Sequence, residues 1–111
     1  MRRGKVYNNN ILAGIIDETD NGQYAFKYTT EYFIDRTKPA ISLTIPKTSQ
    51  AHYSKTLFAF FFNLLSEGEN KKLQCNNLKI DENDHFGLLL KTANEETIGA
   101  IRVQELIEND I

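Results

Sequence analysis

The amino-acid sequence predicts an α+β domain, with a small antiparallel sheet of about five strands, partly barrel-like, and two to three helices packed on one side. Three observations lead to this class. Short alternating apolar runs separated by turn residues fill the first half of the chain, and helix-capping signals accompany apolar stretches in the second half. A last alternating run at 98–103 supplies a closing strand. The 111 residues suffice for one domain, which we expect to span 1–111.

The first three strands are predicted as a meander with two tight turns. A strand at 5–7 leads into Asn8-Asn9-Asn10, where asparagine tolerates the left-handed conformation of turns, and a second strand follows at 11–16. The dipeptide Asn21-Gly22 is a strong hairpin signal. Beyond it, aromatic side chains alternate with others over 24–28, as in a strand with one aromatic face.

A fourth strand is predicted over 40–45. Ile41, Leu43 and Ile45 alternate with small or polar residues, and Pro46 stops the run. His52 then falls in a segment that we expect to be a solvated loop.

The segment 58–65, FAFFFNLL, carries the densest apolar run of the chain. Its periodicity does not separate a helix from a buried strand. In a helix, Phe60, Phe61 and Phe62 would span about 200° of the circumference, so at least one ring would face outward or toward a neighbour. Either a loop covers that ring, or it belongs to an apolar docking patch for another protein.

Two capping signals predict helices in the second half. Ser66 and Glu69 match the capping box S-x-x-E, so a helix is expected to begin at Glu67. Asp81, with Asp84 in the first turn, is expected to cap a second helix. The apolar face of that helix comprises Phe86, Leu89 and Leu90.

Composition limits the class of protein. Thirteen basic and 15 acidic residues give a net charge of −2, which argues against a main role in binding nucleic-acid backbone. No apolar run reaches the ~18 residues of a membrane span, and no apolar segment follows the first arginines, so we expect a cytoplasmic protein. Arg2, Arg3 and Lys5 form a basic start, either a frayed terminus or a weak contact for phosphates.

A cysteine-based active site has little support. Cys75 as nucleophile would need His85 as base and Asp84 to orient it, and nothing in the sequence forces these side chains together. A packed or surface cysteine is the simpler interpretation.

A metal loop at 81–85 is also poorly supported. An EF-hand loop starting at Asp81 would need glycine and glutamate at positions that hold Phe86 and Thr92. A capped helix start explains the same acidic residues, and no metal ion or other cofactor is expected.

Five segments in order resemble the N-terminal subdomain of HipA-type serine/threonine kinase toxins, over residues 4–104. They are KVYNNNILAGII, YAFKYTTEYF, ISLTIP, FFFNLLSEG and IGAIRV, which correspond to a hairpin, a strand, an S-L-x-x-P turn, a helix end and a late strand in that family. The residues that carry the motifs are Gly14, Phe26, Tyr28, Ser42, Leu43, Pro46, Phe60, Phe61, Asn63, Leu64, Leu65, Glu67, Gly68, Gly99 and Ala100. Two places depart from the family pattern: Ser66 replaces a proline, and 94–98 replace an acidic-cysteine stretch.

The resemblance implies a non-enzymatic protein. In these toxins the kinase follows the subdomain, and this chain ends at Ile111 without its ATP loop or catalytic aspartate. A freestanding copy resembles the HipS-type small protein of HipB–HipS–HipT modules. The resemblance therefore implies a subunit that binds a HipT-type kinase in trans and neutralises it, in a ternary complex with a HipB-type DNA-binding protein. The alternative is a scaffold that bridges the two without inhibition. Neither direct nucleic-acid contact nor membrane contact is expected.

The expected partner surface lies at the end of the phenylalanine-rich helix. Gly68 would allow close backbone approach, and Glu67 or Glu69 could pair with cationic groups that otherwise hold phosphates. Simple helix-start electrostatics is the other explanation for these glutamates. The candidate binding residues are Phe62, Asn63, Leu65, Ser66, Glu67, Gly68 and Glu69.

Overall fold

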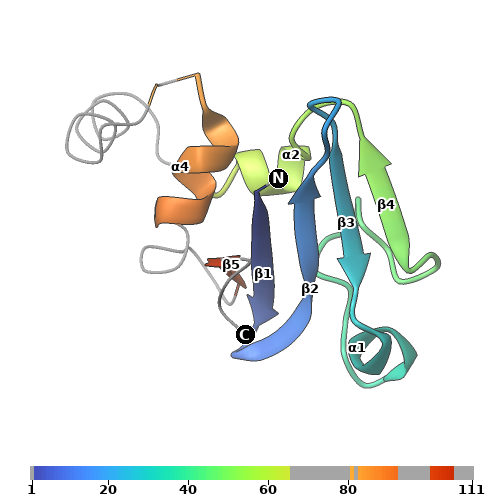
Figure 1. The fold of residues 1–111 in the computed structure, drawn as a ribbon. Helices are drawn as coiled ribbons and strands as arrows, with labels where there is room; N and C mark the ends of the chain where they lie inside the picture. Colours follow the sequence, from blue (N-terminus) through green and yellow to red (C-terminus); the bar gives the residue numbers. More distant parts are fainter. Residues whose placement is uncertain (1, 66–80, 82, 93–100, 107–111) are drawn as a thin grey trace.

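The computed structural model of the protein describes residues 2–65, 81, 83–92 and 101–106, and shows one five-stranded antiparallel sheet (Figure 1). The strand order is β4-β3-β2-β1-β5, so β4 and β5 are the two edges and the sheet is not closed into a barrel. The strands are β1 (Arg3–Asn8), β2 (Ile11–Glu18), β3 (Tyr24–Tyr28), β4 (Ala51–Ser54) and β5 (Ile101–Leu106). The described helices are α1 (Thr30–Ile34), α2 (Ala59–Phe62) and α4 (His85–Thr92). The predicted α+β class is confirmed.

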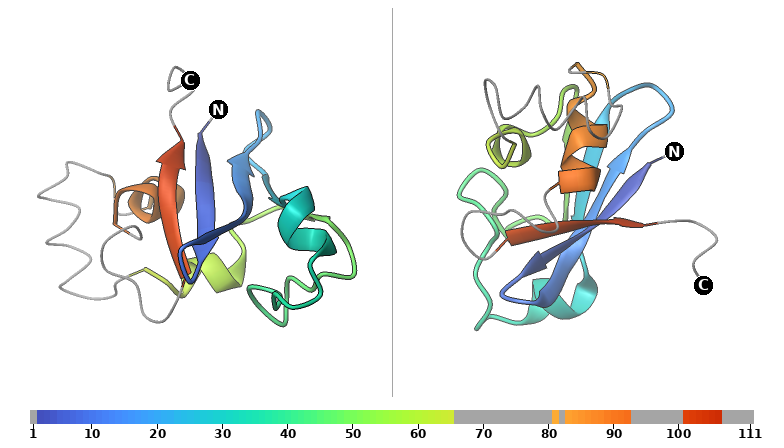
Figure 2. Two further views of the ribbon diagram at one scale, coloured as in Figure 1. Left: turned by 90° about the horizontal axis from the view of Figure 1, so that it is seen from below. Right: turned by 90° about the vertical axis from the view of Figure 1, so that its left-hand side faces the viewer.

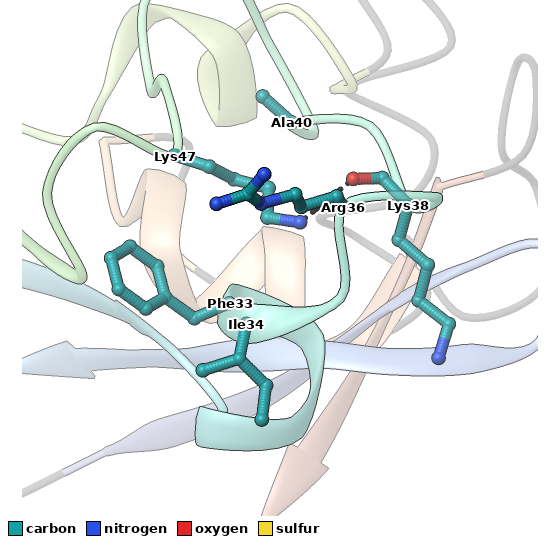
Figure 3. Close-up of a pocket in the computed structure, with 6 residues that line it drawn as sticks. All are labelled: Phe33, Ile34, Arg36, Lys38, Ala40 and Lys47. Carbon is teal, nitrogen blue, oxygen red and sulfur yellow. Dashed lines mark hydrogen bonds between the residues drawn. The ribbon is translucent and has the colours of Figure 1, made fainter.

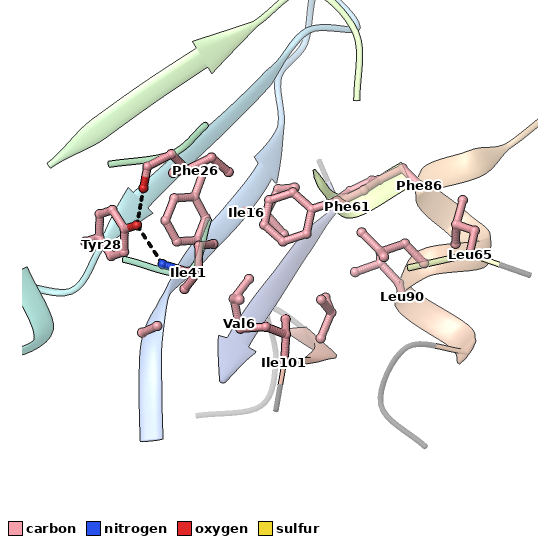
Figure 4. Close-up of a cluster of buried hydrophobic side chains, with 14 of the residues drawn as sticks. Val6, Ile16, Phe26, Tyr28, Ile41, Phe61, Leu65, Phe86, Leu90 and Ile101 are labelled. Carbon is pink, nitrogen blue, oxygen red and sulfur yellow. Dashed lines mark hydrogen bonds between the residues drawn. The ribbon is translucent and has the colours of Figure 1, made fainter. Parts of the chain in front are cut away.

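Helices α2 and α4 lie on the same side of the sheet, and α1 lies beyond the end of β3 (Figures 1 and 2). The core forms between that side and the two helices, because alternate strand residues point to it. Figure 4 shows Phe61 of α2 and Phe86 of α4 in one cluster with strand residues such as Val6 and Phe26, and all four are fully buried. Tyr28 also lies in this core, stacked on Tyr32 of α1 at 5.8 Å between ring centroids.

The two predicted turns of the meander are confirmed by their backbone angles. Asn9 and Asn10 have φ values of 52° and 66°, the pair of left-handed residues that a tight two-residue hairpin requires. Gly22 has a φ of 76° in the next turn, where its amide donates to the Thr19 carbonyl. A bulge falls between Val6 and Tyr7, where the pairing with β2 shifts by one residue.

The predicted strand over 40–45 is wrong: this segment is a turn, closed by an isolated bridge between Ser42 and Ile45. Ile41 and Ile45 are buried, as their alternation indicates. Their backbone groups, however, form hydrogen bonds with the buried Tyr28 hydroxyl and not with a neighbouring strand. The hydroxyl accepts a hydrogen bond from the Ile41 amide at 3.2 Å and donates one to the Ile45 carbonyl. The chain therefore folds back, and Leu43 at the tip is 99% exposed.

The fourth strand is instead β4, which contains His52 in place of the predicted solvated loop. The half-buried His52 lies with Nε2 2.9 Å from the Pro46 carbonyl and 3.0 Å from the Ser49 carbonyl. Because both partners only accept, Nε2 must carry a proton. Helix α1 was also not predicted; the Thr29 side chain caps it by accepting from the Tyr32 amide at 3.2 Å.

Helix α4 begins three residues later than a cap at Asp81 predicts, because Asp84, expected in the first turn, is itself the cap. Arg2 links this cap to the sheet. The Asp84 carboxylate accepts from the Gly87 amide at 3.1 Å and from Arg2 Nη1 at 2.8 Å. Arg2 also makes a two-pronged ion pair with Glu18 at the end of β2, at 2.9 and 2.7 Å. Arg2 is thus an internal clamp, not part of a frayed terminus. Since Arg3 pairs with Asp17 at 2.9 Å, neither arginine is left as a free phosphate contact.

Candidate partner-binding surface

Helix α2 divides its three consecutive phenylalanines between the core and the surface, as its geometry requires. Phe61 is fully buried, with its ring 5.8 Å from that of Phe26, and Phe60 is half-buried. Phe62 is 40% exposed, and its ring meets His85 edge-on at 4.9 Å. The prediction that one ring faces outward or toward a neighbour is confirmed, and both descriptions hold for Phe62.

The chain leaves α2 through a tight turn that ends in the core. Asn63 is exposed and caps the helix by donating its amide to the Ala59 carbonyl at 3.0 Å. Leu64 and Leu65 donate their amides to the carbonyls three residues back, and Leu65 is 8% exposed within the core cluster. Leu65 therefore fixes the position of Phe62 and Asn63 and presents little surface of its own. The remaining candidate residues, Ser66 to Glu69, lie outside the described residues.

Sequence reasoning missed Leu43, the most exposed large apolar side chain among the residues that the structure describes. A side-chain network holds its turn: Ser42 Oγ lies 2.9 Å from Thr44 Oγ1 and accepts from the Thr44 amide at 3.2 Å. Because Ile45 is buried, the turn is anchored to the core while the Leu43 side chain stays exposed. The S-L-x-x-P motif was the signal, since Ser and Thr beside a proline favour a turn over a strand.

The geometry of the described residues gives no support to the cysteine-based active site, which the sequence also disfavours. Asp84 is engaged with Arg2, and hydrogen bonding to that guanidinium holds the pKa of the Asp84 carboxyl below its usual range. His85 packs against Phe62, and Cys75 lies outside the described residues. Among the residues the structure describes, no three histidine, cysteine or acidic side chains converge as a metal site.

The sequence profile of the family described as "HipA N-terminal domain" matches residues 4–104. The chain belongs to this family. The five-stranded sheet and its helices therefore form a HipA N-terminal domain. An uncharacterized protein of Haemophilus influenzae is 32% identical over 105 residues, covering 95% of this chain and 93% of that protein. The solved structure of the "N-terminal domain of HipA toxin" is similar, with a TM-score of 0.73 and 29% identity over 97% of this chain and 95% of that one.

This HipA N-terminal domain exposes apolar side chains on several separate elements. Besides Phe62 and Leu43, Ile34 at the end of α1 and Tyr53 on β4 are largely exposed. No helix in the described part of the domain is long and apolar enough to cross a membrane. The exposed apolar side chains, by their exposure alone, are candidates for contact with other proteins.

Proposed function

We propose that this protein is a non-enzymatic, antitoxin-like subunit that binds a HipA- or HipT-type serine/threonine kinase in trans and neutralises it in the cytoplasm. Membership of the HipA N-terminal domain family over residues 4–104 carries the proposal. The similar solved structure is named as the N-terminal domain of a toxin, which supports a role in a toxin–antitoxin system. The match covers 93% of the Haemophilus relative, so the domain also makes up nearly all of another protein. No cofactor is needed for a role based on binding.

The kinase would contact the end of α2 and the residues that follow it. Phe62 supplies a partly exposed aromatic ring and Asn63 an exposed amide, both held in place by the buried Leu65. Aromatic side chains in such settings often dominate the free energy of binding. Ser66, which follows in the sequence, would also contact the kinase. Glu67 and Glu69 would pair with cationic groups of the kinase that otherwise hold phosphates, and Gly68 would let the two backbones approach closely.

A second candidate function is a scaffold that joins the kinase to a HipB-type DNA-binding protein without inhibiting catalysis. The observation that favours it is the separation of exposed apolar side chains between α2 and the Leu43 turn, which belong to different elements. Two distinct docking sites suit a bridging subunit. In both functions this protein itself makes no specific contact with DNA.

Co-expression with a HipA- or HipT-type kinase from the same organism separates the two functions. Growth rescue together with loss of phosphoryl transfer by the purified complex supports neutralisation, whereas a stable complex with full kinase activity supports scaffolding. The double variant Glu67→Lys/Gly68→Trp should weaken inhibition at least tenfold while the domain stays folded. Glu31→Lys, a charge reversal at an exposed site on α1, is the matched control. If the chain emerges alone from a preparation of all three proteins, the proposal is wrong.

A further inference from the structure

A pocket of about 630 Å³ opens between α1 and the loop that follows it (Figure 3). Its lining residues are Phe33, Ile34, Arg36, Lys38, Ala40 and Lys47. Three of these six side chains are cationic and none is acidic, although the chain as a whole has a net charge of −2. The pocket is therefore positively charged, whereas the protein as a whole is slightly negative.

Lys47 is held in the pocket wall by neutral groups. Its ammonium group donates to the carbonyls of Asp35 and Lys38 at 2.7 and 2.8 Å, and lies 5.0 Å from the centre of the Tyr32 ring. An ammonium group has three N–H donors, so one remains for a further acceptor. No carboxylate among the described residues forms an ion pair with Lys47. Its charge is thus fixed in position but not neutralised.

Asp35, the nearest carboxylate in the loop, is already engaged. It accepts from the Thr37 hydroxyl at 2.6 Å and the Thr37 amide at 2.9 Å, and pairs with Lys38 at 3.1 Å. The Thr37 hydroxyl, its amide and Lys38 lower the pKa of this carboxyl to about 2. Asp35 therefore compensates Lys38, and the charges left in the pocket are those of Lys47 and the exposed Arg36.

The other wall of the pocket is apolar. Phe33 is half-buried, Ile34 is 69% exposed, and Ala40 lies opposite them across the pocket (Figure 3). Two cations beside an apolar wall match a peptide that carries an anionic side chain next to an apolar one. Nucleic acid fits less well, since affinity for its backbone depends on the number of phosphates that the protein neutralises and this pocket offers two uncompensated cations.

We propose that this pocket binds an acidic segment of a protein partner, with a carboxylate or phosphoryl group on Arg36 and Lys47 and an adjacent apolar side chain against Phe33 and Ile34. Arg36 supplies the two-pronged contact that planar oxyanions prefer, and Lys47 supplies a fixed point charge. The site lies on different elements from the kinase-facing end of α2, so it does not depend on the proposed antitoxin role.

The test uses the full chain and a blocked octapeptide with two adjacent glutamates followed by two leucines, titrated by isothermal calorimetry and by ¹⁵N NMR. The expected result is binding with amide shifts centred on 33–47, weakened at least fivefold by Arg36→Gln. A second variant, Lys47→Met, should weaken binding at least as much; its circular dichroism spectrum reports whether the loop change affects folding. Lys55→Gln, an exposed lysine elsewhere, is the matched control and should stay within twofold.

Peptide variants define the chemistry of the ligand. Replacing both glutamates with glutamine should weaken binding at least tenfold, and replacing them with phosphoserine shows whether phosphoryl is preferred over carboxylate. Equal affinity of the glutamine peptide, or equal effects of Arg36→Gln and Lys55→Gln, would overturn the proposal. Tighter binding of a 12-nucleotide single strand than of either acidic peptide would assign the pocket to nucleic acid instead.

Discussion

Phe61 and Phe62 are adjacent in sequence, and we predict that replacing them separates stability from partner binding. Phe61 is fully buried between the rings of Phe26, Phe58 and Phe60, so Phe61→Ala should cost about 3–5 kcal/mol of unfolding free energy. Phe62 is 40% exposed and meets only the ring of His85 among the described ring contacts. Scaling the ~1.5–3 kcal/mol of a fully buried phenylalanine by its covered fraction gives about 1–2 kcal/mol for Phe62→Ala.

Kinase binding should respond in the opposite order. If Phe62 inserts into a pocket of the kinase, its truncation should remove about 2 kcal/mol or more of binding free energy, roughly a 30-fold rise in Kd. Urea unfolding gives the stability of each variant, and calorimetric titration of the purified kinase gives the affinity; Phe61→Leu replaces Phe61→Ala if the latter does not fold. A Phe62→Ala variant that binds the kinase within threefold of wild type would refute the assignment of this ring to the interface.

Three further predictions concern the Arg2 clamp and the exposed turn. Because Arg2 lowers the pKa of Asp84, the stability from their ion pair is present above the ordinary aspartate pKa and is lost as the pH falls through the lowered value. Asp84→Asn keeps the cap but loses this part, so the wild-type advantage of about 0.5–1 kcal/mol at pH 7 in urea unfolding should shrink steadily as the pH falls below the ordinary aspartate pKa. A difference that stays unchanged at acidic pH would exclude the pair as its source. Gly87→Ala should lower stability by about 1 kcal/mol despite alanine's higher helix propensity. The added methyl group would collide with the Asp84 carboxylate and approach Arg2 Nη1 to 2.9 Å. A higher thermal midpoint for the variant would show that Asp84 and Arg2 can move to make room for it. Leu43→Ser should change stability by less than about 0.5 kcal/mol in thermal melts, and a loss above 1 kcal/mol would mean that this side chain is covered.

The fold was predictable wherever local geometry decided the outcome. Asn9, Asn10 and Gly22 adopt left-handed angles for reasons that act within two residues, and Asp84 caps a helix through its own side chain. The prediction of a strand at 40–45 was wrong because the Tyr28 hydroxyl, 13 residues before Ile41, forms hydrogen bonds with the backbone of this segment. Alternation correctly assigned Ile41 and Ile45 to the core, but burial on alternate positions also fits a turn pinned at both ends.

The candidate surface was predictable only in part. Three consecutive phenylalanines in one helix require one outward ring by geometry alone, and the structure shows this ring to be that of Phe62. Leu43 and the Arg36–Lys47 pocket depend on how the loop after α1 folds back, which no periodicity encodes. The sequence leaves Arg2 as either part of a frayed terminus or a weak phosphate contact, because its partners, Glu18 and Asp84, are 16 and 82 residues away.

The position of β5 has a consequence for synthesis on the ribosome. Strand β1 pairs with β2 after a two-residue turn, but its other neighbour, β5, spans Ile101–Leu106. At about 5–20 residues per second, the second partner emerges roughly 5–20 s after the first. During that interval the hydrogen-bonding edge of β1 is open, and open edges recruit strands from other chains. A nascent chain stalled before Ile101 is therefore expected to aggregate, and a chaperone that shields the β1 edge should raise the yield of native protein.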